Sequence, residues 1–208
     1  MISMLNETHL YPIGRIILLA IEEILGVQEA ADLLNHARLL RSFKGSRTAK
    51  EGAKFPFKYI LRLQDALTEV YGPRAGAGLS MRIGQASLKY SLREFDSQLG
   101  ITRMDFRLLP FPRRLKSGCE ALAGLFNSTT DLRIDQQSDS KQICWQFEPG
   151  TPYRKEPGRK PCCPLMSGFL GEAFSWMSGG RSFLVEENYK NAAGVTICSI
   201  AVDRTPLG

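Results

Sequence analysis

Histidine is scarce in this chain, with two among 208 residues, and the scarcity limits which catalytic mechanisms are available. His9 lies ahead of the first expected helix, and His36 falls on the polar face of its helix, so no Ser-His-Asp or Cys-His arrangement can be assembled. The glycine-rich segment 72–80 follows an expected helix and lacks the last glycine of a dinucleotide-binding loop. The sequence therefore favours a binding function over an enzyme.

Long apolar runs are also missing. The longest apolar stretch near the start, 13–26, is interrupted by Arg15 and by two adjacent glutamates, which makes it too short and too charged for a membrane span or a signal sequence. With 43% hydrophobic residues the chain can nevertheless bury one sizeable core. We expect a soluble, cytoplasmic protein without a membrane span.

Five cysteines are an odd number for a disulfide framework, and none of them forms a C-x₂₋₄-C pair typical of zinc knuckles. Cys162 and Cys163 are adjacent, ahead of a proline and an apolar segment. Four thiolates, from Cys144, Cys162, Cys163 and Cys198, are the candidate ligands of a zinc ion. Burial as small apolar side chains and redox or nucleophilic use are the other two interpretations.

Positive charge is concentrated in two segments of a chain whose formal net charge is +6. Residues 38–62 hold eight Lys or Arg against one Glu, and residues 153–160 hold four against one. Such segments attract polyanions, acidic head groups or carboxylate ligands, although charge runs usually mark solvated loops. No nucleic-acid-binding motif accompanies them, so we do not expect a nucleic-acid partner.

Hydrophobic periodicity divides the chain into a helical part, 1–100, and an α+β part, 101–208, within a single domain. Apolar residues at helical spacing predict helices over 13–25, 27–39, 55–72, 74–99, 112–127 and 164–178. Alternating patterns predict strands over 131–138, 141–148, 181–189 and 195–203, the last two joined by a short turn. The C-terminal half thus has the order α-β-β-α-β-β. We expect an α+β fold in which N-terminal helices pack with a four-stranded antiparallel sheet.

Two of these helices, 74–99 and 164–178, carry apolar residues on more than one face and therefore need more than one packing partner. The second apolar face of the helix 74–99 could pack against another subunit, which makes a homodimer one prediction. A central position of this helix within one chain would cover both faces equally well. An apolar pocket between the two helices and the sheet is the other prediction. Its candidate ligand-binding residues are Trp145, Cys162, Met166, Phe169 and Trp176, with Arg82 at the rim for a carboxylate.

The segments SGFLGEAF (167–174) and FLVEENYKNAAGVTICSIAV (183–202), with the order of elements, resemble the 4-vinyl-reductase domain family, or hydrocarbon-binding proteins. Tyr189 departs from the pattern, because the family commonly has cysteine there. The resemblance implies a fold shared with TRAPP vesicle-tethering subunits and haem nitric-oxide-binding domains. It also implies a small apolar or tetrapyrrole-like ligand, and a link to bacteriochlorophyll synthesis, despite a family name that suggests a reductase.

From these observations we expect a sensor or carrier module for an apolar, aromatic or tetrapyrrole-like ligand. The alternative is a structural or protein-interaction domain that is stabilised by cysteine-bound zinc and takes no ligand.

Overall fold

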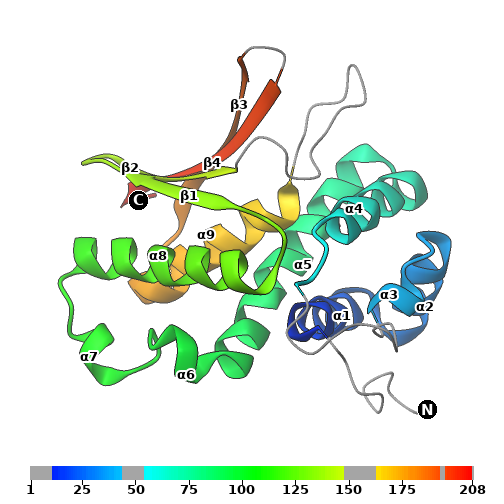
Figure 1. The fold of residues 1–208 in the computed structure, drawn as a ribbon, viewed down its shortest axis with the longest axis horizontal. Coiled ribbons are helices and arrows are strands. Elements are labelled where there is room, and N and C mark those ends of the chain that lie inside the picture. The colour runs from blue at the N-terminus through cyan, green and yellow to red at the C-terminus, as the bar shows by residue number, and fades with distance from the viewer. Residues whose placement is uncertain (1–10, 44–53, 148–162, 193–194, 208) are drawn as a thin grey trace.

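The computed structural model describes residues 11–43, 54–147, 163–192 and 195–207, and it has the α+β architecture expected from the sequence (Figure 1). In chain order the elements are α1 (Pro12–Leu25), α2 (Val27–His36), α3 (Leu40–Phe43), α4 (Lys58–Tyr71), α5 (Pro73–Glu94), α6 (Asp96–Leu99), α7 (Met104–Arg107), α8 (Phe111–Thr129), β1 (Ile134–Ser138), β2 (Gln142–Phe147), α9 (Pro164–Ser178), β3 (Phe183–Ala192) and β4 (Val195–Pro206).

The four strands form one antiparallel sheet in the order β1-β2-β4-β3. Trp145 on β2 pairs with Ile200 on β4, and both side chains are fully buried on the face that α8 and α9 cover. Their neighbours Cys144 and Ala201 pair with each other on the outer face. The alternation of successive side chains across a strand therefore divides the sheet into an apolar inner face and a more polar outer face.

Helix α5 is the centre of the helical layers. It packs against α1 and α4 on one side and against α9 on the other, and α9 separates it from the sheet (Figure 1). Its apolar faces thus find partners within the chain, which is one of the two arrangements predicted for this helix. None of the described helices has both the length and the apolar character needed to cross a membrane.

The contact between α5 and α9 is backbone against backbone. A Cβ atom built on Gly84 would overlap the carbonyl oxygen of Leu165, and one built on Gly168 would overlap the carbonyl oxygen of Met81. Ser80, on the same side of α5 as Gly84, is buried and donates a hydrogen bond of 3.2 Å to the side chain of Gln64 on α4. The small residues of α5 therefore set how closely its neighbours approach.

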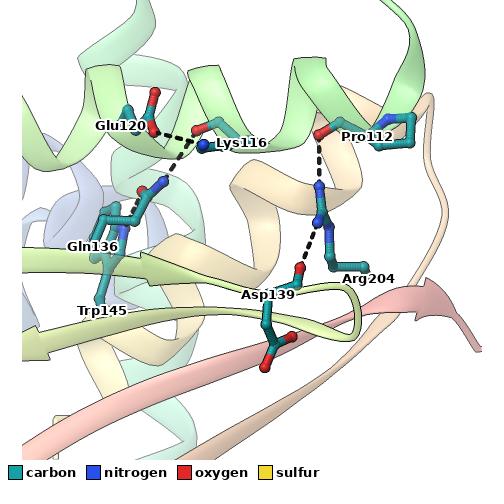
Figure 2. Close-up of polar contacts among 7 residues, drawn as sticks. All are labelled: Pro112, Lys116, Glu120, Gln136, Asp139, Trp145 and Arg204. Carbon is teal, nitrogen blue, oxygen red and sulfur yellow. Dashed lines mark hydrogen bonds and ion pairs between the residues drawn. The ribbon is translucent and has the colours of Figure 1, made fainter.

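Helix α8 is attached to the sheet by polar contacts of its first two turns (Figure 2). The guanidinium of Arg204 on β4 donates to the backbone oxygens of Pro112, at 2.9 Å, and Asp139, at 2.6 Å. The side-chain amide of Gln136 on β1 donates to the backbone oxygen of Lys116 at 3.2 Å. These bonds fix α8 across the inner face, where it closes one side of the core.

Two predicted helices end earlier than the periodicity indicates. The helix expected over 74–99 divides at Phe95, whose backbone leaves the helical region (φ −114°, ψ 22°), and α6 follows as a separate turn. The helix expected over 27–39 ends at His36, ahead of Arg38 with φ 54°. Hydrophobic spacing continues through both breaks, so the pattern alone does not reveal them. The predicted turn at Gly194 lies outside the described residues.

We expect Gly84→Ala to lower the free energy of unfolding by about 1–3 kcal/mol or more, because the added methyl group forces α5 and α9 apart. Gly78→Ala is the matched control in the same helix, since its Cβ would meet nothing within 4 Å. Removing a helix-interior glycine there should raise stability by about 0.5–1 kcal/mol. Chemical denaturation followed by circular dichroism measures the free energy of unfolding of both variants. Equal changes in the two variants would contradict the close crossing of α5 and α9.

Candidate functional site

A solvent-open groove of about 790 Å³ runs along one side of α5. Helix α1 forms one wall, α9 the other, and the α6–α7 region closes one end. Its lining residues are Glu23, Ile24, Arg82, Gln85, Ala86, Leu88, Lys89, Leu92, Arg93, Asp96, Thr102, Arg107, Glu172 and Trp176. The volume lies within the range of small-molecule sites in proteins.

The floor of the groove is apolar. Leu88 and Leu92 are buried one helical turn apart on α5, and Ile24 of α1, Ala86 of α5 and Trp176 of α9 are partly exposed beside them. The indole of Trp176 offers a flat surface for a planar ligand. The floor can therefore shelter an apolar or aromatic body.

One cation of the groove is already paired. Lys89 donates a hydrogen bond of 2.6 Å to one carboxylate oxygen of Glu23, and the hydroxyl of Tyr90 donates to the other at 2.8 Å. The bond from Lys89, with a smaller contribution from Tyr90, holds the pKa of Glu23 below its ordinary value, although partial burial acts in the opposite direction. The same bond raises the pKa of Lys89. This ion pair ties α1 to α5 along the groove wall.

Three guanidinium groups at the groove remain available. Arg82, Arg93 and Arg107 are exposed and form no ion pair with another described residue. The carboxylate of Asp96 accepts a hydrogen bond from the hydroxyl of Thr102. Arginine presents a planar set of donors that suits carboxylates, so the rim favours an anionic group on the ligand.

The structure places two of the predicted ligand-binding residues at this groove. Arg82 on α5 and Trp176 on α9 both line it. Trp145, Met166 and Phe169 lie instead in the packed core, each at most 1% exposed. Cys162 lies outside the described residues.

Core packing accounts for the buried aromatic residues. The ring of Phe126 on α8 meets Trp145 edge-to-face at 6.0 Å and Phe169 at 5.1 Å. The indole N–H of Trp145 donates to the side-chain oxygen of Gln136 at 3.1 Å, as Figure 2 shows. These contacts fill the space between α9 and the sheet, and the described groove lies on the α1 side of α5 and α9.

Of the four candidate zinc ligands, Cys162 lies outside the described residues, and the other three are not arranged as a metal site. The strand register puts Cys144 on the outer face of the sheet and Cys198 on the inner face. Cys163 is buried at the start of α9. In the part of the chain that the structure describes, no group of three His, Cys, Asp or Glu side chains is arranged to hold a metal ion.

Sequence reasoning did not select Arg93, Arg107 or Cys119. Arg93 was recognisable as part of the charged side of α5, since it follows Arg82 and Lys89 by eleven and four positions. Nothing in the sequence connects Arg107 to the charged side of α5. Arg107 reaches the groove only because α6 and the turn after α6 lead the chain back to it. Cys119 is fully buried in α8, and burial raises the pKa of its thiol far above the ordinary value.

No protein-family model and no curated protein matches this chain. Solved structures of H-NOX domains match it over nearly its whole length. An oxygen-binding H-NOX domain related to soluble guanylate cyclases, in its oxygen complex, has a TM-score of 0.55 at 12% identity and covers 93% of this chain and 94% of its own. The chain shares the H-NOX fold.

Two further structures agree. An H-NOX mutant from T. tengcongensis has a TM-score of 0.55 at 13% identity, covering 94% of this chain and 97% of its own. An Fe(II) unliganded H-NOX mutant from K. algicida has a TM-score of 0.53 at 9% identity, covering 94% and 96%. The fold expected from the resemblance is thereby confirmed, and identities this low bear on the fold alone.

Glu23→Gln tests the ion pair of the groove. Because the folded pKa of Glu23 lies below its ordinary value of 4.5, its contribution to stability is present above pH 4.5 and is lost as the pH falls through the folded pKa. We expect the variant to be less stable at pH 7 by under about 1 kcal/mol, since both groups are partly exposed. The difference should shrink in acid.

Urea denaturation at a series of pH values measures this difference. Glu120→Gln serves as the control, because Glu120 contacts Lys116 at 3.9 Å on an exposed helix face. If the stability difference between Glu23→Gln and the unaltered protein grows in acid, the pKa of Glu23 is not lowered by its bond to Lys89.

Zinc content tests the alternative role of the cysteines. We expect protein purified without added zinc to carry far less than one zinc per chain, and Cys144→Ser to leave its metal content unchanged, because Cys144 and Cys198 occupy opposite faces of the sheet. Plasma mass spectrometry measures the zinc content per chain of both proteins. Near-stoichiometric zinc that Cys144→Ser removes would establish the zinc-stabilised domain instead.

Proposed function

We propose that this protein is a non-enzymatic small-molecule-binding module, a sensor or carrier, whose site is the groove along α5. The observation that carries the proposal is the convergence of an apolar floor, the indole of Trp176 and three available guanidinium groups in one hollow. The ligand is an apolar, flat molecule that bears at least one carboxylate. Its body lies on Leu92 and Trp176, and its carboxylate reaches Arg82 or Arg93.

A rival hollow on the outer face of the sheet suits such a ligand less well. It has a volume of about 500 Å³ and is lined mainly by amide and hydroxyl side chains, among them Gln137, Gln146, Asn188 and Ser199. Its described lining contains one aromatic residue, Tyr189, and neither an arginine nor a lysine that could pair with a carboxylate. An anionic aromatic ligand therefore makes more favourable contacts in the groove along α5 than in this hollow.

Several of the structures with this fold concern haem, and one describes protein-induced porphyrin distortion. Iron in haem is usually held by histidine, cysteine, methionine or tyrosine. None of the described residues that line the groove is of these types. His36 is exposed at the α2–α4 surface, where its ring contacts Glu69 at 2.9 Å, and the buried Cys119 retains its proton. The described lining of the groove thus does not fit iron-coordinated haem.

A metal-free tetrapyrrole with carboxylate side chains, or a smaller aromatic acid, fits the proposal better. Either would be held by its apolar face and its carboxylates without a bond from the protein to a central metal. The resemblance to 4-vinyl-reductase domains supports this ligand class and, through it, a role linked to bacteriochlorophyll metabolism.

The position of the groove suggests how a bound ligand acts as a signal. Its lining comes from α1, α5, α9 and the α6–α7 region, so a ligand contacts segments that are distant in the sequence. A ligand carboxylate beside Lys89 competes with Glu23 for the bond that ties α1 to α5. Binding therefore stabilises one relative position of these helices over others, which is what a sensor requires.

Binding of a metal-free porphyrin dicarboxylate, followed by quenching of the fluorescence of Trp145 and Trp176, tests the proposal. Arg82→Gln should weaken binding about tenfold, because a charge-assisted hydrogen bond is lost. Trp176→Leu should weaken it by a similar factor, measured by porphyrin absorbance. Arg62→Gln, on the exposed side of α4 and away from the groove, is the matched control.

Two results would overturn the proposal. One is the absence of binding by the porphyrin and by a panel of aromatic and fatty acids. The other is binding that Arg82→Gln and Arg62→Gln weaken equally. Native mass spectrometry of the freshly purified protein adds an independent measurement, because it reports both a co-purified ligand and a homodimer.

A further inference from the structure

Two large apolar side chains are displayed to solvent around the short helix α7. Met104 is 69% exposed and Leu108 is 77% exposed, the highest values among the large hydrophobic side chains of the described residues. Leu108 follows Met104 by four positions and its backbone N–H bonds to the Met104 carbonyl at 3.1 Å, so both lie on the same side of one helical turn. Figure 1 shows α7 at a corner of the molecule, far from α2 and α3.

Positive charge surrounds this apolar pair. The segment 103–116 contains five Lys or Arg and a single acidic residue, Asp105. Arg103 precedes Met104, Arg107 lies between Met104 and Leu108 in the sequence, and Arg113 is exposed at the beginning of α8. Asp105 contacts Arg103 at 3.4 Å and can offset only one of these positive charges. The segment therefore keeps an excess of positive charge.

Tertiary contacts bring further guanidinium groups to the same corner. Arg114 donates a hydrogen bond of 2.8 Å to the carbonyl oxygen of Arg107, which joins the start of α8 to the end of α7. The guanidinium carbons of Arg114 and Arg181 lie 6.0 and 5.9 Å from the ring centroid of Phe111. That ring stacks on Phe183 at 6.4 Å and so anchors the cluster to the sheet.

We propose that this corner docks the protein on the surface of an anionic lipid bilayer. Met104 and Leu108 insert at the boundary between head groups and acyl chains, and Arg103, Arg113 and Arg181 contact the lipid phosphates. Exposed apolar side chains with arginines on the same turn and on the adjoining elements match the layered chemistry of that interface, where a polar anionic layer covers an apolar one. The net charge of +6 favours approach to such a surface.

The apolar pair argues for a bilayer over an acidic protein surface. Met104 and Leu108 are exposed on one helical turn at a corner of the molecule, whereas protein interfaces bury their apolar anchors in matching pockets. A bilayer accepts projecting apolar side chains without a preformed pocket. This inference is independent of the proposed ligand, although Arg107 belongs to both surfaces and is therefore left unchanged in the test.

Vesicle co-sedimentation tests the proposal with the full chain. We expect binding to vesicles of phosphatidylcholine mixed with phosphatidylglycerol, little binding to phosphatidylcholine alone, and weakening by added salt. Leu108→Ser should reduce binding about tenfold, because less apolar surface is inserted. Arg103→Gln and Arg113→Gln should each reduce it about fivefold.

Matched controls come from α4, where Val70 is 50% exposed and Arg62 is exposed. Val70→Ser and Arg62→Gln should leave vesicle binding unchanged. Leu108→Trp should show a blue shift in fluorescence with the mixed vesicles, and Val70→Trp should not. Thermal melts confirm that each variant is folded.

Three outcomes would overturn the proposal. They are a failure of the unaltered protein to bind the mixed vesicles, equal losses in the α7 and α4 variants, and a loss with the arginine variants while Leu108→Ser binds normally. The last would indicate attraction by charge alone without insertion. None of these results depends on whether the groove along α5 binds a ligand.

Discussion

The close crossing of α5 and α9 is the constraint on which the rest of the structure depends. Gly84 and Gly168 remove the side chains that would hold the two backbones apart, so the main chain of one helix lies against that of the other. Helix α9 in turn packs on the inner face of the sheet, while α1 and α4 pack on the other sides of α5. One pair of glycines therefore sets the spacing between the helical layers and the sheet.

The same crossing explains where the groove lies. The glycine contacts involve residues 81–84 of α5 and 165–168 of α9, and the groove includes Arg82 from this contact and continues along both helices to Arg93 and Trp176. Beyond the contact the side chains become long, and the surface between them opens to solvent. Helix α1 completes the wall through the pair of Glu23 with Lys89.

This protein shares the fold of H-NOX domains, but the side chains that line its groove differ from the residue types that usually bind haem iron. The arrangement of helices and sheet matches H-NOX domains at 9–13% identity, but the described groove offers arginines and tryptophan in place of the residue types that usually bind haem iron. A fold positions backbone, whereas a ligand is chosen by the side chains that the sequence puts on it. The aromatic residues expected at a pocket, Trp145 and Phe169, here fill the core around Phe126.

The sequence by itself determined the order and type of the main elements, because helical and alternating periodicities are local and survive without knowledge of the fold. It also marked Arg82 and Trp176, one on the charged side of α5 and the other on a helix with apolar residues on more than one face. Only the tertiary structure decided which apolar side chains are core and which line a surface, since α9 has large apolar side chains on several faces in sequence. It also set Cys144 and Cys198 on opposite faces of the sheet and brought Arg107 beside Arg93, because strand register and the turn after α6 are fixed by packing between distant segments.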